Sequence, residues 1–180
     1  MDSTDLTLIF PVRGDGEFSL TFEMRRPHSR LEIIGLLYSQ NQDCIRLNTL
    51  QHHLAPSTTS SLLVKSVLDQ AAEFYYDGTI RVEAQAQKTD AYQRNENLIL
   101  TKSAHAETKP TLEIMANDVR CTHGATISPP NRQQLWYLQT RGISEVSAQQ
   151  LLVNGFLAAA LSHVPQKLRQ SAIQKLAMPL

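Results

Sequence analysis

The sequence lacks several features that define common protein classes. It has 180 residues but only two cysteines, Cys44 and Cys121. Two thiols are too few for a disulfide framework in a chain of this length, so we expect reduced cysteines and a cytoplasmic protein. No apolar run reaches the roughly 18 residues that a membrane span needs. The first ten residues carry two acids and no base, unlike a secretory signal.

The sequence also has no excess of positive or negative charge. Lys and Arg together number 17, as do Asp and Glu, so the formal net charge is zero. Without a basic excess to displace counterions, we expect no nucleic-acid partner. Neutrality also removes electrostatic repulsion between molecules, which favours a protein that works in a complex. A hydrophobic fraction of 42% is typical of a folded chain with a sizeable core.

Two common catalytic motifs are absent. The chain contains no Gly-x-x-x-x-Gly-Lys-Ser/Thr loop, so we do not expect it to hydrolyse ATP. It contains no Gly-x-Ser-x-Gly elbow for a serine hydrolase. A solenoid enzyme acting on carbohydrate would need clustered acids, whereas the acids here are scattered. We therefore expect a protein that is not an enzyme.

Short alternating apolar and polar runs recur along the first two thirds of the chain, as they do in half-buried strands. After an early run at 18–23, they begin near Leu31, Cys44, Ser61, Thr79, Asn97 and Thr111. Glycine is scarce, at 7 residues, and between the runs that start at Leu31 and Thr111 the one Asp-Gly dipeptide is Asp77-Gly78. A hairpin-rich sandwich would need more such turns, so the pattern favours a parallel β-solenoid and leaves the sandwich as the alternative.

After a Pro-Pro pair at 129–130, the sequence pattern changes from that of strands to that of helices. Residues 131–140 predict one helix, with Gly142 as its left-handed cap. Ser144 is a suitable N-cap for a longer helix that runs to about residue 161. Residues 166–178 predict a third helix.

The chain therefore divides into two parts. We expect a β-helix core over 1–128 and a C-terminal α-helical subdomain over 129–180. An uncapped solenoid exposes an unpaired sheet end, so residues 1–30 are a possible cap.

Cys121 and His123 are the residues most suited to site chemistry. They lie two positions apart after an alternating segment, so in an extended strand they share a face. Sulfur and nitrogen ligands together suit zinc or iron–sulfur chemistry, but two ligands do not complete a site. Either a partner chain supplies the rest, or Cys121 is a small core residue and His123 a hydrogen-bonded one.

Cys44, His52 and His53 form a second group that could suggest a metal site. Adjacent histidines in a strand point to opposite faces, so at most one of them could join Cys44. We expect no metal site there.

Four ordered motifs are similar to those of the SufB/SufD family, the scaffold proteins of Suf iron–sulfur cluster assembly. The clearest is the run Asp-Val-Arg-Cys-Thr-His-Gly-Ala-Thr at 118–126, whose Cys-x-His-Gly-Ala-Thr form resembles SufD more than SufB. The other motifs lie at 69–82, 86–100 and 135–143.

The resemblance implies a right-handed parallel β-helix followed by helices, which bind the SufC ATPase. It also implies pairing with SufB, or in a homodimer, at the C-terminal end of the β-helix. A transient iron–sulfur cluster would form at that subunit interface, with no cofactor bound permanently. The ligand candidates are His123 and Cys121. The expected pairing residues are Glu113, Met115, Arg120, Thr122 and Thr126. The expected ATPase-docking residues are Ala148, Leu151, Leu152, Gly155 and Phe156.

The chain also departs from the family pattern, because members are longer and much of their β-helix has no counterpart here. A truncated paralogue, a split gene product and a fragment would each fit. Two functions follow: a SufD-like scaffold with a role at the cluster, or a truncated member that only binds or regulates the complex.

Overall fold

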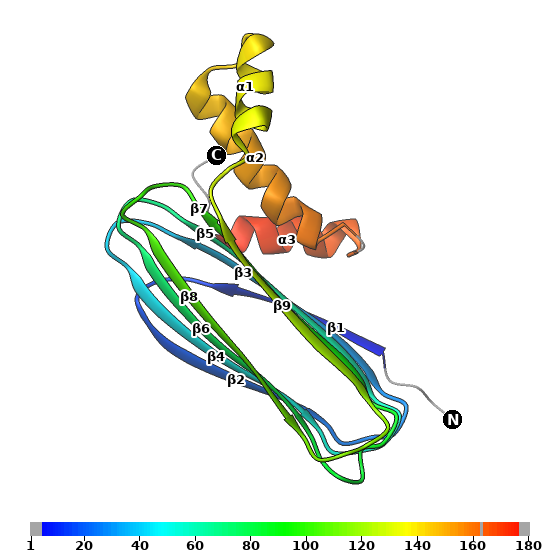
Figure 1. The fold of residues 1–180 in the computed structure, drawn as a ribbon. Helices are drawn as coiled ribbons and strands as arrows, with labels where there is room; N and C mark the ends of the chain where they lie inside the picture. Colours follow the sequence, from blue (N-terminus) through cyan, green and yellow to red (C-terminus); the bar gives the residue numbers. More distant parts are fainter. Residues whose placement is uncertain (1–4, 163, 177–180) are drawn as a thin grey trace.

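The computed structural model describes residues 5–162 and 164–176. In this part of the chain, nine strands are followed by three helices (Figure 1). The strands are β1 (Asp5–Val12), β2 (Gly16–Met24), β3 (Arg30–Ser39), β4 (Cys44–His53), β5 (Thr59–Leu68), β6 (Glu73–Val82), β7 (Asp90–Ile99), β8 (His105–Ile114) and β9 (Arg120–Ser128). The helices are α1 (Arg132–Thr140), α2 (Glu145–Ala160) and α3 (Gln166–Leu176).

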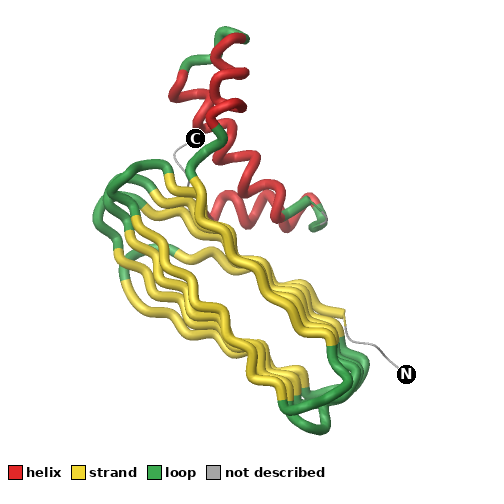
Figure 2. Tube along the Cα trace, in the orientation of Figure 1, coloured by secondary structure: helices red, strands yellow, loops and turns green. Residues whose placement is uncertain are grey.

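The strands alternate between two sheets. One sheet has the order β1-β3-β5-β7-β9, the other has the order β2-β4-β6-β8, and all neighbours are parallel. The chain thus passes from one sheet to the other and back, as a β-solenoid of about four turns (Figure 2). The predicted mainly β solenoid is confirmed, and the sandwich alternative is excluded because it requires antiparallel hairpins.

The core lies between the two sheets. Along β6, alternate residues are buried, and Phe74, Tyr76, Ile80 and Val82 point inward. Equivalent residues of successive coils stack on one another, since the pairing keeps each inward residue opposite the next. Each fully buried aliphatic or aromatic side chain stabilises the fold by about 1.5–3 kcal/mol relative to exposure.

Polar residues in this interior explain why some strand limits were predicted poorly. β7 begins at Asp90 and not near Asn97, because its inward residues Gln93, Asn95 and Asn97 are polar and hide the alternation. Asp77-Gly78 is not a turn but the middle of β6, where Gly78 is buried. A Cβ on Gly78 would lie 2.2 Å from Gln93 Nε2, so glycine is required by this close approach.

The turns between coils contain few glycines because other residues take the left-handed conformation. Positive φ angles of 55–61° occur at His28, Asn41, Ser57, Gln70 and Lys88. Each such residue costs roughly 1 kcal/mol or more relative to a right-handed conformation. Repeated packing of the coils offsets that cost, which is why the sequence shows few Gly-containing turn signals.

The possible cap predicted over residues 1–30 contains β1 and β2. β1 pairs with β3, and β2 pairs with β4, both in parallel. Among the described strands, β1 and β2 are the first in the order of their sheets.

The helical tail folds back onto one sheet. α1 and α2 pack on each other and rise beyond the ends of the strands, and α3 lies near β1 and β3 (Figure 1). Asn131 caps α1, and Ser144 caps α2 as predicted. The outer face of the β1-β3-β5-β7-β9 sheet contributes Ile34, Leu36, Val67 and Leu98 to a cluster with Val153, Leu157, Ala160, Leu161, Val164 and Ala172.

Lys65 of β5 anchors α2 to this sheet. Its ammonium donates to the Phe156 carbonyl at 2.9 Å and lies 2.9 Å from a Glu96 carboxylate oxygen. It also lies 4.3 Å from the centre of the Phe156 ring. Only 7% of Lys65 is exposed, so this contact is almost dry.

Among the residues that the structure describes, no helix is long and apolar enough to cross a membrane.

Candidate functional site

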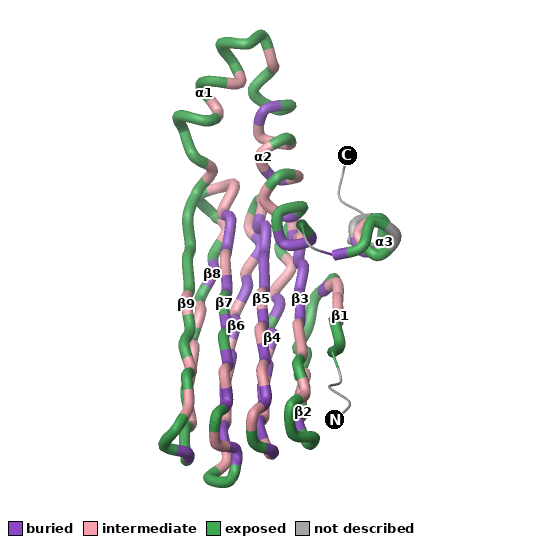
Figure 3. The backbone as a smooth tube through the Cα atoms, turned by 90° about the vertical axis from the view of Figure 1, so that its right-hand side faces the viewer, coloured by how far each residue is buried: buried purple, intermediate pink, exposed green. Residues whose placement is uncertain are grey.

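The C-terminal end of the solenoid is open. Among the residues that the structure describes, β8 pairs with β6 alone and β9 with β7 alone, so each strand has a free edge. Buried positions run along β3, β5 and β7, whereas β9 is mostly exposed (Figure 3). Pro110 lies in β8, which suits a terminal strand because proline cannot donate a ladder hydrogen bond. The end therefore presents two strand edges with core side chains between them.

Cys121 and His123 both face this open interior. They pair in register with Ala91 and Gln93 of β7, which are 1% and 2% exposed and point inward. No further coil covers β9, so Cys121 is half-buried and His123 is exposed. Cys121 and His123 therefore lie on one face of β9, as predicted. That face points toward the interior at the C-terminal end of the solenoid.

The two side chains differ chemically. Cys121 packs against the cluster of Ile80, Val82 and Ala91, and this burial raises the pKa of its thiol. A thiol in such a setting is a poor nucleophile and must lose a proton before it can bind a metal. In the described part of the chain, the His123 imidazole has no hydrogen-bond partner, so its nitrogens are free for a ligand.

A polar network beneath β9 holds the strand in place. Asn97 donates from Nδ2 to the Thr126 carbonyl at 3.1 Å and to Asn95 Oδ1 at 2.6 Å. The Ser66 hydroxyl donates to Asn97 Oδ1 at 2.6 Å, and Thr108 of β8 donates to Asn95 Oδ1 at 2.6 Å. These bonds join both open-edge strands, β8 and β9, to the buried interior.

The predicted pairing residues surround this end but lie on different faces. Glu113 lies on the outer face of the β2-β4-β6-β8 sheet and pairs with Arg81. Thr122 and Thr126 lie on the outer face of the other sheet, because they alternate with His123. Arg120 pairs with Asp90 at the start of β9.

Met115 and three further large apolar side chains are exposed at the same end. Met115 follows β8 and is 49% exposed. Sequence reasoning missed Leu112, Ile114 and Ile127, which face the uncovered interior and are 37–50% exposed. The alternation of Leu112 and Ile114 with Thr111 and Glu113 was the available signal.

The predicted ATPase-docking residues lie on different sides of α2. Ala148 is buried, and Phe156 packs against Lys65 of the sheet. Leu151 and Gly155 are exposed, and Leu152 is half-buried. A partner on the open side of α2 would thus contact Leu151 and Gly155 rather than Ala148.

Exposed aromatic and aliphatic residues of the helical hairpin extend this surface. Trp136 and Tyr137 of α1 are 68% and 54% exposed, and Val146 of α2 is 73% exposed. These residues were not predicted to contact a partner. Their helical periodicity does not distinguish a partner-facing stripe from a core-facing one.

The second group of candidates is spread along β4, with Cys44 at its start and His52 and His53 at its end. Within the described ranges, no group of three or more His, Cys, Asp or Glu residues could hold a metal ion. His53 is buried between Thr58 and Ser60, whereas His52 faces outward and contacts Glu83 at 2.7 Å.

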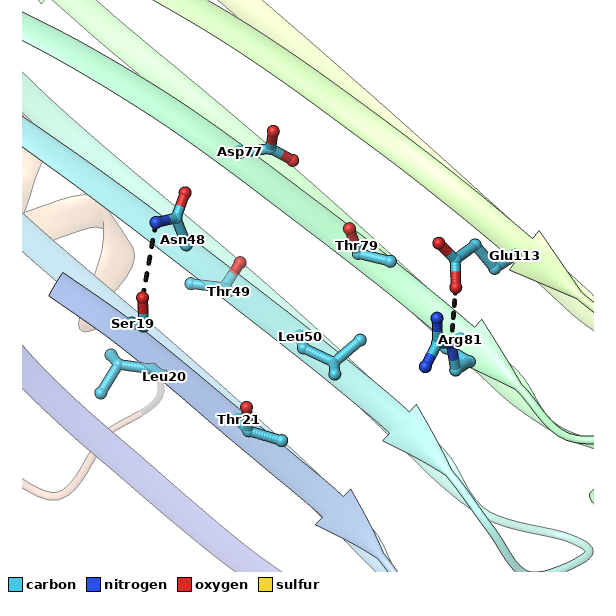
Figure 4. Close-up of a pocket in the computed structure, with 10 residues that line it drawn as sticks. All are labelled: Ser19, Leu20, Thr21, Asn48, Thr49, Leu50, Asp77, Thr79, Arg81 and Glu113. Carbon is cyan, nitrogen blue, oxygen red and sulfur yellow. Dashed lines mark hydrogen bonds and ion pairs between the residues drawn. The ribbon is translucent and has the colours of Figure 1, made fainter. Parts of the chain in front are cut away.

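A cavity of about 230 Å³ lies on the outer face of the β2-β4-β6-β8 sheet (Figure 4). Two pairs of its polar groups contact each other: Asn48 donates to Ser19, and Arg81 pairs with Glu113.

Comparison with known proteins gives a consistent result. Residues 17–156 match the family model described as "SUF system FeS cluster assembly, SufBD core domain". The iron–sulfur cluster assembly protein SufD of Escherichia coli is 34% identical over 136 residues, covering 76% of this chain and 32% of that protein.

Two further relatives belong to the same group. An iron–sulfur cluster assembly SufBD family protein of Synechocystis is 37% identical over 110 residues, covering 61% of this chain and 24% of the relative. One from Mycobacterium tuberculosis is 32% identical over 141 residues, covering 74% and 36% respectively. The chain thus spans about a quarter to a third of the length of these curated relatives.

Proposed function

Since this chain belongs to the SufB/SufD family of iron–sulfur cluster assembly proteins and is SufD-like, we propose that it is a scaffold subunit without ATPase activity. In this role it pairs with a SufB-type partner and binds a SufC-type ATPase. The nascent iron–sulfur cluster is the cargo of the complex, held transiently where the scaffold subunits meet.

The observation that carries this proposal is the open C-terminal end of the solenoid. Two free parallel edges there flank exposed Leu112, Ile114 and Ile127. A partner with a similar end would pair with the edges and bury the apolar side chains together, which is how strand edges and interface cores are normally satisfied.

His123 is the residue of this chain best suited to bind the cargo. Its imidazole is exposed, has no partner in the described residues and points into the space that pairing would enclose. Cys121 lies on the same face, but its thiol is half-buried and its pKa is raised. We therefore assign a direct ligand role to His123 and a secondary role to Cys121, with the remaining ligands supplied by the partner.

The ATPase docks, in this proposal, on the exposed side of the α1–α2 hairpin. Leu151 and Gly155 lie there with Val146, and the α1 aromatic residues are also exposed. Because Lys65 ties α2 to the sheet that ends in β9, a movement of the hairpin would be transmitted toward the strand that carries His123.

The alternative is a truncated member that binds or regulates the complex without a direct cluster role. It is favoured by the half-buried Cys121 thiol, because burial raises its pKa and so disfavours the thiolate that a metal ligand must provide. The two functions differ in whether His123 is needed once the complex has formed.

The test is co-expression with SufB-type and SufC-type partners, purification of the complex and anaerobic cluster reconstitution. His123→Ala should leave the complex intact but lower the cluster yield severalfold, measured by absorbance and iron content. His105→Ala, in an exposed position on an outer face, is the matched control and should retain the yield. Full yield from an intact His123→Ala complex would refute the ligand role and support the regulatory alternative.

Docking is tested separately with Leu151→Asp. This change should abolish co-purification of the ATPase, because it places a charge on the exposed side of α2. Leu168→Asp, on exposed α3, is the control and should leave binding unchanged. Equal loss of the ATPase in both variants, or in neither, would contradict docking on the hairpin.

A further inference from the structure

Gln93, on the inward face of β7, has one polar atom that the fold leaves unsatisfied. The residue is 2% exposed, and its amide nitrogen donates to the Gly78 carbonyl at 3.1 Å. Because a carbonyl can only accept, the amide oxygen must face away from Gly78. Among the described residues this oxygen is buried and has no hydrogen-bond partner. A buried acceptor without a donor costs about 1–3 kcal/mol, so a donor that reached it would be held there.

The other two inward amides of β7 are satisfied. Asn95 Oδ1 accepts from the Thr108 hydroxyl at 2.6 Å, and Asn97 Oδ1 accepts from the Ser66 hydroxyl at 2.6 Å. The structure describes β7 throughout, so the unsatisfied amide oxygen among its inward residues is that of Gln93.

The residues stacked on either side of Gln93 differ in what they can donate. Gln93 lies in register with Leu62 of β5 and with His123 of β9. Leu62 has no polar side-chain atom, whereas the His123 imidazole is exposed and has no hydrogen-bond partner in the described part of the chain. The Tyr76 hydroxyl also lies near the Gln93 amide, but it is hydrogen-bonded to Thr49 at 2.8 Å. A free donor and a free acceptor therefore lie on neighbouring strands, about 4.8 Å apart.

We propose that Gln93 positions His123 for its role as a ligand, an inference that rests on the proposed function. The imidazole turns about its side-chain bonds and donates one ring N–H to Gln93 Oε1. This bond needs no backbone movement, because exposed side chains change rotamer within nanoseconds. The bond fixes which ring nitrogen carries the proton and leaves the lone pair of the other nitrogen facing outward. Histidine ligands in metal sites are normally oriented by a hydrogen bond of this kind.

The direct test is the tautomer of His123 in the full chain, read from the side-chain nitrogen NMR shifts at alkaline pH, where imidazoles are neutral. The unaltered chain should show a single tautomer, assigned from the signals that His123→Ala removes. Gln93→Met keeps the side-chain length but removes the acceptor, so His123 should then show the averaged signals of an imidazole that exchanges between tautomers. Averaged signals in the unaltered chain would overturn the proposal without any variant.

Gln51→Met is the matched control. Gln51 is fully buried, donates to Ser60 Oγ at 2.7 Å and has an amide oxygen without a partner in the described part, but it lies in register with Ile80 rather than His123. Both substitutions should lower the melting temperature, and only Gln93→Met should change the His123 signals. The same change in both variants would refute a specific positioning role for Gln93.

Cluster reconstitution in the co-expressed complex separates this inference from the proposed function. Gln93→Met should lower the cluster yield severalfold, and Gln51→Met should retain it. A full yield from Gln93→Met together with a low yield from His123→Ala would overturn the positioning role and leave the ligand role standing. A full yield from His123→Ala would instead refute the proposed function.

Discussion

Lys65 is the residue through which the helical tail should depend most on the solenoid. Its ammonium meets the Phe156 carbonyl and the Glu96 carboxylate, each at 2.9 Å, in an almost completely buried position. Lys65→Met keeps the length and apolar stem of the side chain but removes the charge. The change therefore tests the polar contacts while largely preserving the packing.

The magnitude follows from what the substitution leaves behind. Removing one partner of a buried ion pair typically costs about 3–5 kcal/mol, because the other charge stays buried and unpaired. Here Glu96 retains a second contact with Arg94, which is itself half-exposed, so part of the charge remains compensated. We expect Lys65→Met to lower the free energy of unfolding by about 2 kcal/mol.

Urea unfolding followed by circular dichroism measures this loss, and hydrogen exchange locates it. The amides of α2 should lose more protection than those of β4 and β6. Lys109→Met is the matched control: Lys109 is largely exposed and lies 3.7 Å from Asp77, so its loss should cost less than about 0.5 kcal/mol. Adding Glu96→Gln to Lys65→Met should recover part of the loss, because it removes the unpaired carboxylate.

An equal loss for Lys65→Met and Lys109→Met would refute this reasoning. It would mean that the apolar cluster beneath α2 holds the tail without the buried pair. A loss of protection spread evenly over all strands would equally contradict a local anchor.

Two further predictions concern the solenoid interior. Burial lowers the pKa of His53 from 6.5 to about 4, so below pH 6.5 the unfolded chain binds more protons and stability falls as pH falls toward 4. Between pH 7.5 and 4.5 the free energy of unfolding, measured by urea titration, should fall by about 2.5 kcal/mol. The fall should be smaller in the His53→Gln variant. An equal fall in both proteins would contradict His53 as its cause. Gly78→Ala should destabilise by about 1–3 kcal/mol because its Cβ would meet Gln93 and Tyr76 at 2.2 and 2.6 Å. At Gly155 in α2, an added Cβ would have no atom within 4 Å, so Gly155→Ala should stabilise the protein by up to about 1 kcal/mol. Melting temperatures that shift in the same direction for both glycine variants would refute this contrast.

The helices and several strands could be predicted because their signals are local. Asn131 and Ser144 begin α1 and α2 as N-cap residues whose side chains accept backbone N–H bonds. β3 to β5 were recognisable because apolar side chains such as Leu37, Leu47 and Leu62 occupy part of their inward positions. β7 was only partly recognised, since its inward amides Gln93 and Asn95 donate to carbonyls of other strands, which no local pattern reveals.

The candidate site was predictable only in part for the same reason. The Cys-x-His spacing correctly placed Cys121 and His123 on one strand face, because alternation is a property of any extended chain. The exposure of that face could not be predicted, since it depends on β9 having no neighbour beyond β7. Likewise, the α2 pattern did not show that Ala148 faces the protein and Leu151 faces outward.

The sequence by itself determined the elements with short-range causes: the alternation of most strands, the helix caps and the family signature at 118–126. The tertiary structure decided which faces are covered, because burial depends on coils that lie about 30 residues apart. Among the described residues, β9 has no strand neighbour beyond β7, and this leaves His123 exposed on the inward face of β9. That exposure depends on which strands lie beside β9, and the local pattern at 118–126 does not encode it.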